Sequence, residues 1–294
     1  MNSTLLKPTC DFCGKAEFRT LRSARMHGRD SAIISSSSNS SLMSELLSCL
    51  NCGLQQVERI RSSEDLLSAY ESVIDETHSE NSDLRVRSFQ RAMKKIMKIE
   101  PKISPKDAPH LVDIGCAGGE FPYAAHKLGF KVTAFEPSAH LSKIGREKYN
   151  LDIRSGAFDK SEFEESSVDV VTLWDVLEHV DSPKKMISDV VPILRPGGYL
   201  VLNLPMIDTP SARILRFRWP FYLEVHLYYF TMKTIRNYLV EADFTVISHK
   251  PYSQTLSVDY LVRRASGGRF KKFPIKMPFR YRLGQRTIVA QLHK

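Results

Sequence analysis

An acidic residue and a glycine-rich turn at residues 111–121 form the segment of the chain best suited to chemistry. A short apolar run ends in Asp113 and is followed by Gly115, Ala117 and Gly119. The dinucleotide fingerprint G-x-G-x-x-G has a third glycine further on and is not preceded by such an acid. A carboxylate at Asp113 instead favours a cationic or amine-bearing ligand near the end of a strand.

A second acidic residue follows at the spacing of a nucleotide-binding βαβ unit. Residues 131–138 read as a second strand that ends at Glu136, and this residue lies 21 positions after Gly115. A distance of about 20 residues is usual for the acid that binds ribose hydroxyls. Apolar residues from Phe121 to Leu128 recur at helical spacing between the two strands. The segment therefore predicts a nucleotide-type site, with an ordinary βαβ unit and a chance turn as the alternative.

Two further segments follow the turn in a recognisable order. An apolar strand at 168–174 leads into Asp-Val-Leu-Glu-His-Val, and Leu-Arg-Pro-Gly-Gly-Tyr at 194–199 reads as a helix stop and tight turn. Together, residues 109–205 resemble the core of class I S-adenosylmethionine (SAM)-dependent methyltransferases. Ala117 replaces a glycine of many members, which leaves the sign of φ there open. The resemblance implies an α/β fold, with a Rossmann-like, mostly parallel seven-stranded sheet, helices on both faces and an antiparallel last strand.

The resemblance also implies which residues bind SAM. Asp113 and the glycine turn would hold the methionine end, Glu136 the ribose, and the residues after the third strand the adenine. The full implied set is Asp113, Gly115, Cys116, Ala117, Gly119, Glu136, Pro137, Ala157, Phe158, Trp174 and Asp175.

Four of the five cysteines occur in two Cys-x-x-Cys-Gly units, as Cys10, Cys13, Cys49 and Cys52. The two-residue spacer lets both sulfurs of a unit reach one tetrahedral ion, and four thiolates leave no open position. The pattern predicts a structural zinc site, with disulfides as the competing interpretation. The 35 residues between Cys13 and Cys49 include eight serines within Ser31–Ser44, which predict a flexible loop and no helix or strand.

Positive charge is concentrated in the C-terminal segment. The net charge is +9, and residues 260–294 contain ten Lys or Arg and no Asp or Glu. Aromatic residues, including Phe270, Phe273 and Phe279, alternate with these cations. The segment could face RNA phosphates, an anionic membrane or an anionic substrate, while a solvated structural hairpin is the alternative.

The chain is long enough for a core domain with additions. We expect a zinc-binding module at 1–60, a helical linker at 61–105 and a methyltransferase domain at 106–294. Within that domain, 206–230 would be an aromatic insertion that covers substrate, and 260–294 would carry the last strand. No apolar run approaches the ~20 residues of a membrane span, and no secretory signal is visible, so we expect a cytoplasmic location.

Methyl transfer needs an aligned acceptor and a group that removes its proton. His226 lies in a His-Leu-Tyr-Tyr-Phe element that resembles the family's segment after the fifth strand, and His179 follows the fourth strand. These histidines are the candidate bases, with Tyr222 as a hydrogen-bonding helper. Adjacent Glu178 and His179 would not share a helix face, so no catalytic metal is expected there.

Nearly the whole chain resembles bacterial class I methyltransferases with an N-terminal four-cysteine zinc domain, many of which act in cell-surface polysaccharide, sugar or secondary-metabolite pathways. The leading hypothesis is methylation of a small molecule, such as a sugar or a lipid-linked glycan intermediate. RNA methylation, with the zinc module and basic segment binding RNA, is a second hypothesis. A non-catalytic SAM-binding or scaffold protein is a third.

Overall fold

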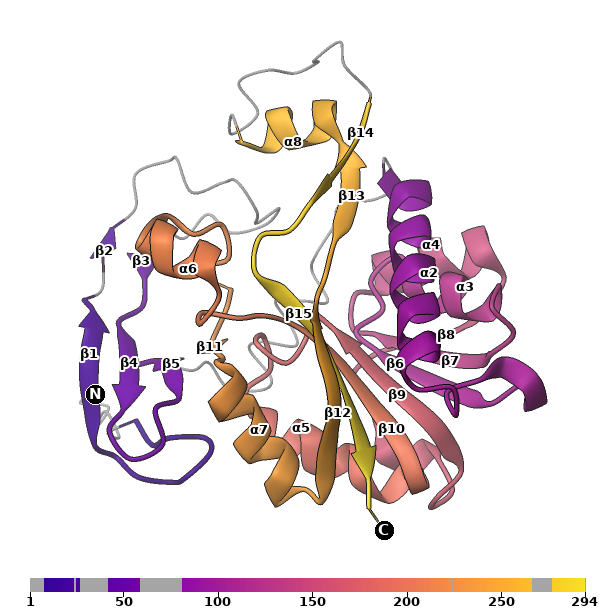
Figure 1. Cartoon of the computed structure of the whole chain (residues 1–294), viewed down its shortest axis with the longest axis horizontal. Helices are drawn as coiled ribbons and strands as arrows, with labels where there is room; N and C mark the ends of the chain where they lie inside the picture. The colour runs from indigo at the N-terminus through magenta and orange to yellow at the C-terminus, as the bar shows by residue number, and fades with distance from the viewer. Residues whose placement is uncertain are drawn as a thin grey trace.

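A seven-stranded sheet forms the centre of the protein (Figure 1). The computed structural model describes residues 8–23, 25–26, 42–58, 81–223, 225–265 and 277–293. The strand order is β12-β15-β10-β9-β6-β7-β8, with bounds Phe244–Pro251, Gln285–Leu292, Leu194–Pro205, Val168–Trp174, His110–Ile114, Lys131–Glu136 and Asp152–Ser155. Strands β6 to β10 run parallel, and β15 is antiparallel to both β10 and β12. The predicted Rossmann-like, mostly parallel sheet with an antiparallel last strand is confirmed.

Both faces of this sheet are apolar, which is why its strands read as continuous apolar runs. In β10, Tyr199 and Val201 join one buried cluster, while Leu200 and Leu202 join the cluster on the other face. Successive side chains of a strand point to opposite faces, so each strand supplies both cores.

Helices cover the two faces of the sheet (Figure 1). Helices α2 (Ser82–Ile99) and α3 (Glu120–His126) pack on one face, and α5 (Pro183–Val190) and α7 (Met232–Glu241) on the other. Helix α4 (Ala139–Tyr149) packs against β7 and β8. Helix α2 packs with one apolar face, because Met93 and Ile96 belong to one buried cluster and Phe89 and Met97 pack against it. Residues 61–80 of the predicted linker lie outside the described residues.

The N-terminal segment forms a smaller antiparallel sheet that shares a strand with the larger domain. Its order is β1 (Phe18–Arg22), β4 (Leu46–Cys49), β5 (Gln55–Val57) and β11 (Tyr228–Tyr229). Tyr228 pairs with Gln56, and the Val57 backbone N–H donates to the Leu227 carbonyl at 2.9 Å. The aromatic segment of residues 206–230 is therefore tied to the N-terminal sheet through β11.

The predicted serine-rich loop is only partly visible. Residues 27–41 lie outside the described residues. Leu42–Met43 form strand β3, paired with β2 (Arg25–Met26), so the expectation of a loop through Ser44 is wrong at its C-terminal end. Backbone pairing stabilises these two apolar residues as strand although the flanking serines disfavour it.

The C-terminal region adds a hairpin beside α2. Strands β13 (Gln254–Ser257) and β14 (Pro278–Tyr281) pair, and α8 (Val258–Ala265) follows β13. Helix α6 (Pro210–Leu215) lies within the aromatic segment of residues 206–230. Among the described residues, no helix combines the length and the apolar character needed to cross a membrane.

Candidate active site and cysteine cluster

The loop between β6 and α3 turns through three left-handed positions. The φ angles are +75° at Gly115, +48° at Ala117 and +83° at Gly119. A Cβ at Gly115 would lie 2.6 Å from Val176 Cγ2, so glycine is required there by space as well as by conformation. Ala117 adopts the positive φ that the sequence left open, at a cost of roughly 1–2 kcal/mol for an L-residue. The loop is thus a strained, close-fitting backbone cradle.

Glu136 lies at the end of β7, next to this loop. Its Oε2 accepts a hydrogen bond from the Ala117 N–H at 2.8 Å, and its Oε1 accepts one from the Ser138 N–H at 2.9 Å. Two backbone donors therefore fix the orientation of the carboxylate. Each carboxylate oxygen can accept more than one hydrogen bond, so the arrangement fits a ribose diol.

Asp113 lies beneath the loop. It is 1% exposed, and the Thr172 hydroxyl on β9 donates to its Oδ1 at 2.5 Å. Burial raises the pKa of Asp113 well above its usual value, against the lowering effect of the Thr172 bond. Cys116 is also buried within the loop. Thr172 was not among the predicted residues, although a hydroxyl inside the apolar run of β9 was a visible signal.

Trp174 and Asp175 lie where β9 ends. Asp175 has a φ of +56° and accepts hydrogen bonds from Asn203 Nδ2 at 2.9 Å and from Gln285 Nε2 at 2.7 Å. Asp175 is exposed to solvent. The surrounding protein nevertheless limits the hydration of its carboxylate and raises its pKa to about 6, although the two hydrogen bonds lower it. Asn203 and Gln285 were also missed, and the single amide inside the apolar strand Tyr199–Leu204 was the available signal.

The residues predicted to contact adenine lie after β8. The Gly156 backbone N–H donates to the Glu136 carbonyl at 3.0 Å, which places Ala157 and Phe158 near the end of β7. Ala157 is exposed, whereas the Phe158 ring packs edge-on against Phe135 at a centroid distance of 5.5 Å. Pro137 is half-buried beside Glu136. The structure therefore brings the predicted SAM-binding residues together around one loop, and their ligand contacts stay predictions.

His179 and His226 lie against each other although they are far apart in the sequence. Their ring centroids are 4.6 Å apart, in an edge-to-face arrangement. The Val225 carbonyl is 3.0 Å from His179 Nδ1, and because a carbonyl only accepts, Nδ1 carries the hydrogen and Nε2 is the acceptor nitrogen. Burial lowers the pKa of His179 to about 4, so its ring is neutral at neutral pH.

His226 is the more deeply buried of the two. It is 3% exposed, against 19% for the His179 side chain, and none of the described residues is a hydrogen-bond partner of its Nδ1. Burial and the nearby His179 lower the pKa of His226 well below its usual value, opposed by a hydrogen bond to the Phe221 backbone. The greater exposure favours His179 for contact with an acceptor.

Glu178 completes this cluster. It is 1% exposed, and Oε1 is 4.0 Å from His179 Nε2. Within the part of the chain that the structure describes, neither carboxylate oxygen has a hydrogen-bond partner. Burial, and then the charge of Asp175, raise the pKa of Glu178 well above its usual value. One ligand atom from each of Glu178, His179 and His226 lies within 4.8 Å of the others, a set that could hold a metal ion. The helix-face argument does not apply here, because Glu178 and His179 lie in a turn and His226 comes from another segment, and the expectation that no catalytic metal binds here stays a prediction.

The aromatic segment of residues 206–230 makes hydrogen bonds and ring contacts with neighbouring parts of the chain. The Tyr228 hydroxyl donates to the Asp181 carbonyl at 2.6 Å, and Trp219 Nε1 donates to the Leu283 carbonyl at 2.6 Å. Tyr222 is half-buried and its ring lies 4.9 Å from that of Tyr229, which in turn is 6.1 Å from the His226 ring. Tyr222 is thus one ring removed from the histidine pair.

The four predicted ligand cysteines meet in one cluster. Their sulfurs lie within 4.8 Å of one another, with Cys10 Sγ 3.5 Å from Cys52 Sγ and Cys13 Sγ 3.6 Å from Cys49 Sγ. All four thiols are free of disulfides. Four convergent thiols on two tight turns suit tetrahedral Zn²⁺, so the residues fit the ion that the sequence predicts.

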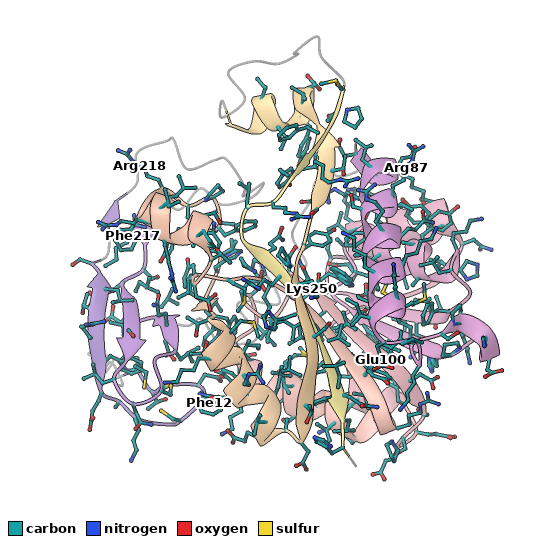
Figure 2. The ribbon with its side chains drawn as sticks, in the orientation of Figure 1. Phe12, Arg87, Glu100, Phe217, Arg218 and Lys250 are labelled. Atoms are coloured by element: carbon teal, nitrogen blue, oxygen red, sulfur yellow. The ribbon has the colours of Figure 1, made fainter. Side chains whose placement is uncertain are left out.

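The first cysteine turn is anchored to the larger domain. The Asp11 carboxylate accepts hydrogen bonds from the Ser182 hydroxyl at 2.5 Å and from the Tyr238 hydroxyl at 2.8 Å. Phe12 lies beside α7, with its ring 4.9 Å from that of Tyr238 (Figure 2). The first cysteine turn is thereby connected to Ser182, three residues after His179, and to helix α7.

The fold and the loop with its paired Glu136 define a protein of the SAM-dependent methyltransferase class. A family model described as a methyltransferase domain matches residues 84–249, which is more than half of the chain. The chain therefore belongs to this methyltransferase domain family.

Solved structures share this fold at low sequence identity. A putative methyltransferase from Bacillus halodurans is 16% identical with a TM-score of 0.50, and the match covers 67% of this chain and 98% of that one. A putative sarcosine dimethylglycine methyltransferase from Galdieria sulphuraria is 13% identical with a TM-score of 0.50, covering 71% and 86%.

Curated relatives match over a shorter segment. Ubiquinone biosynthesis O-methyltransferase from Xanthomonas campestris is 33% identical over 108 residues, which is 35% of this chain and 45% of that protein. The enzyme of the same name from Coxiella burnetii is 28% identical over 110 residues, covering 36% and 47%. The chain spans about half the length of these relatives.

Proposed function

We propose that this protein transfers a methyl group from SAM to a small-molecule acceptor. The observation that carries the proposal is the placement of Glu136 at the end of β7, where the Ala117 and Ser138 N–H groups orient its carboxylate beside the glycine loop. SAM would supply an activated methyl group on a positively charged sulfur. The Gly115 and Gly119 positions would let the loop backbone approach that ligand closely.

The chain's own task would be to align the acceptor and to receive its proton. We propose that the histidine pair serves this role through His179 Nε2, the acceptor nitrogen of a neutral ring. His226 would position that ring from the edge and exclude water. Tyr222 would act only through the intervening Tyr229 ring, as part of the packing around the pair.

The acceptor class is the open element of this proposal. The sequence resemblance implies a sugar or lipid-linked glycan intermediate, while the names of the curated relatives point to a ubiquinone precursor for those enzymes. Both acceptor types are small molecules, which suits a base that is mostly enclosed by protein. RNA methylation through the basic segment, and SAM binding without catalysis, are outcomes that an assay separates.

We also propose that Cys10, Cys13, Cys49 and Cys52 hold a structural zinc ion. Residues 1–60 would then form a zinc-binding module, joined by a helical linker at 61–105 to a catalytic domain at 106–294. A reducing, cytoplasmic setting would keep the four thiols available for metal. The convergence of the four sulfurs supports this arrangement.

The test is methyl transfer from radiolabelled SAM into cell extract that is then separated into lipid-glycan, quinone, small-molecule and RNA fractions. Label in a glycan, quinone or other small-molecule fraction is the expected result and identifies the acceptor. Label in RNA alone would overturn the small-molecule proposal. If no fraction is labelled, calorimetric titration with S-adenosylhomocysteine decides, because a chain that binds it without catalysis fits the non-catalytic hypothesis. A Glu136→Gln variant serves as the background control.

A further inference from the structure

A cavity outside the methyl-transfer site opens between α2 and the strands of the C-terminal region. Its volume is about 340 Å³, in the range of small-ligand pockets. It is lined by six cations, Arg91, Lys95, Lys98, Lys250, Arg280 and Arg282. Figure 2 shows Lys250 near the middle of the molecule, beside α2. We call this feature the basic cavity.

Three separate elements contribute these cations, and in each element the spacing of the residues places their side chains on one face. On α2, Ser88, Arg91, Lys95 and Lys98 follow each other at steps of three or four residues and so share one helix face. Ser248 and Lys250 alternate on one side of β12, and Arg280 and Arg282 do so at β14. Segments far apart in the sequence therefore converge on one concave surface.

Within the described part of the chain, no carboxylate compensates the positive charge of the basic cavity. No Asp or Glu lines it, and among the described residues none of its six cations has a carboxylate within 4.0 Å. Like charges held together in this way repel each other, and a concave wall of one sign concentrates counter-ions. An anion would relieve the repulsion.

One residue that lines the basic cavity has a buried hydroxyl. Tyr252 is 5% exposed, and among the described residues its Oη has no hydrogen-bond partner. A phenol hydroxyl can donate to a phosphate oxygen. Nearby, the Arg91 guanidinium is held toward the hydroxyl of Thr255 at 2.7 Å, so one cation at the cavity is already oriented.

We propose that the basic cavity binds a small phosphate-bearing molecule, with the Tyr252 hydroxyl and the surrounding lysines and arginines as its ligands. A concave volume of this size fits a phosphate or diphosphate group with a small attached moiety, whereas a nucleic acid or a membrane needs an extended surface. Tyr252 also lies beside the candidate SAM site, because its ring is 5.6 Å from that of Trp174. Binding does not depend on methyl transfer.

The experiment is calorimetric titration of the full chain with inorganic pyrophosphate, which contains no adenosine and so does not compete for the SAM site. Saturable binding is expected, and Lys95→Glu should weaken it by about tenfold or more. Lys94→Glu is the matched control, because it makes the same charge change on α2 at a residue that does not line the cavity. It should leave affinity within about twofold.

Tyr252→Phe tests the buried hydroxyl while keeping the ring that packs on Trp174. It should weaken pyrophosphate by about three- to tenfold, with unchanged binding of S-adenosylhomocysteine. Absence of saturable pyrophosphate binding would overturn the proposal, as would equal loss in Lys94→Glu and Lys95→Glu. Tighter, steeply salt-dependent binding of single-stranded RNA that Lys95→Glu abolishes would replace it with a nucleic-acid surface.

Discussion

The glycine loop and the histidine pair lie beyond the ends of the neighbouring strands β6 and β9, yet they are constructed differently. The loop, Glu136 and Ser138 lie within one stretch of the chain. Hydrogen bonds from backbone N–H groups to the Glu136 carboxylate join them. The histidine pair combines His179, which follows β9, with His226, whose segment continues into β11 and pairs with the N-terminal sheet. One half of the site is local in sequence, and the other depends on the assembly of the whole chain.

This difference predicts how each half of the site responds when the N-terminal sheet is disrupted. Loss of the N-terminal sheet should disturb the histidine pair, because the Leu227 N–H donates to the Glu178 carbonyl and the Val57 N–H to the Leu227 carbonyl. The described contacts of the glycine loop are instead with β7, β8, α4 and Val176 after β9, and none of them involves the N-terminal sheet. The variants below test this contrast.

The largest effect is expected from loss of metal at the cysteine cluster. Binding free energies of structural zinc reach roughly 10–16 kcal/mol, so Cys10→Ser with Cys52→Ser should unfold the N-terminal sheet and abolish turnover. Zinc content, circular dichroism and turnover are the measurements. Binding of S-adenosylhomocysteine should persist within about threefold, because the glycine loop is local.

Cys116→Ser is the control for this double variant, since Cys116 is a buried thiol outside the cluster. It should retain the full zinc content. If the double variant kept zinc, or kept its N-terminal structure without metal, the structural zinc proposal would be refuted.

The second effect concerns the proton acceptor. His179→Asn should lower kcat by roughly 10²–10⁴-fold, the usual contribution of general-base catalysis, with SAM affinity unchanged. His226→Asn should lower kcat less, because His226 is proposed to position the other ring. Single-turnover rates for both variants provide the measurement. A larger loss in His226→Asn would assign the base to His226 instead.

The sequence alone was sufficient to predict which residues of the local half of the candidate site lie together. Asp113, the glycine turn and Glu136 could be assigned because strand ends and turns have recognisable residue types at fixed spacing. The seven-stranded sheet followed from the same motifs. Contacts between distant segments carry no such spacing, which is why Thr172, Asn203 and Gln285 were missed and Glu178 was not linked to His226. The stripe of cations on α2 was visible as a helical periodicity, but its partners on β12 and β14 could not be read from the chain.

A third effect belongs to the local half. Glu136→Gln places an amide N–H₂ group against the Ala117 or Ser138 N–H, so that two donors face each other. It also removes the carboxylate charge to which both N–H groups donate. Hydrogen bonds to charged groups contribute about 1.5–3 kcal/mol each, so we expect SAM affinity to fall by about 10²-fold. Titration with S-adenosylhomocysteine measures this loss. Glu147→Gln, at an exposed residue paired only with Lys143, should leave affinity unchanged, and a similar loss there would contradict the assignment.

A fourth effect is the pH dependence of stability that the buried histidines impose. The pKa of His179 is about 4 in the folded protein and 6.5 in its ordinary state. Between these pH values the unfolded chain binds a proton that the folded chain does not. The free energy of unfolding should therefore fall as the pH decreases from about 6.5 to about 4, by on the order of 2 kcal/mol from this residue.

Chemical denaturation of wild type and His179→Asn at a series of pH values measures that slope. Across this pH range, the slope of the unfolding free energy against pH should decrease in the variant by the amount that corresponds to one bound proton. His226 has a pKa shift of the same direction, so part of the slope should remain. An unchanged slope in His179→Asn would mean that His179 is not buried as a neutral ring.

The smallest effect tests whether the strain in the glycine loop is as local as its hydrogen bonds. Ala117 has a φ of +48°, which costs an L-residue roughly 1–2 kcal/mol, whereas glycine avoids that cost but loses about 0.4–1 kcal/mol through greater freedom in the unfolded chain. Ala117→Gly should therefore stabilise the protein by about 0.5 kcal/mol. Ala124→Gly, within α3 and fully buried, should instead destabilise it by about 1 kcal/mol or more. Equal destabilisation by both variants in thermal unfolding would show that Ala117 contributes packing that outweighs its backbone strain, and the loop would then depend on its surroundings as the histidine pair does.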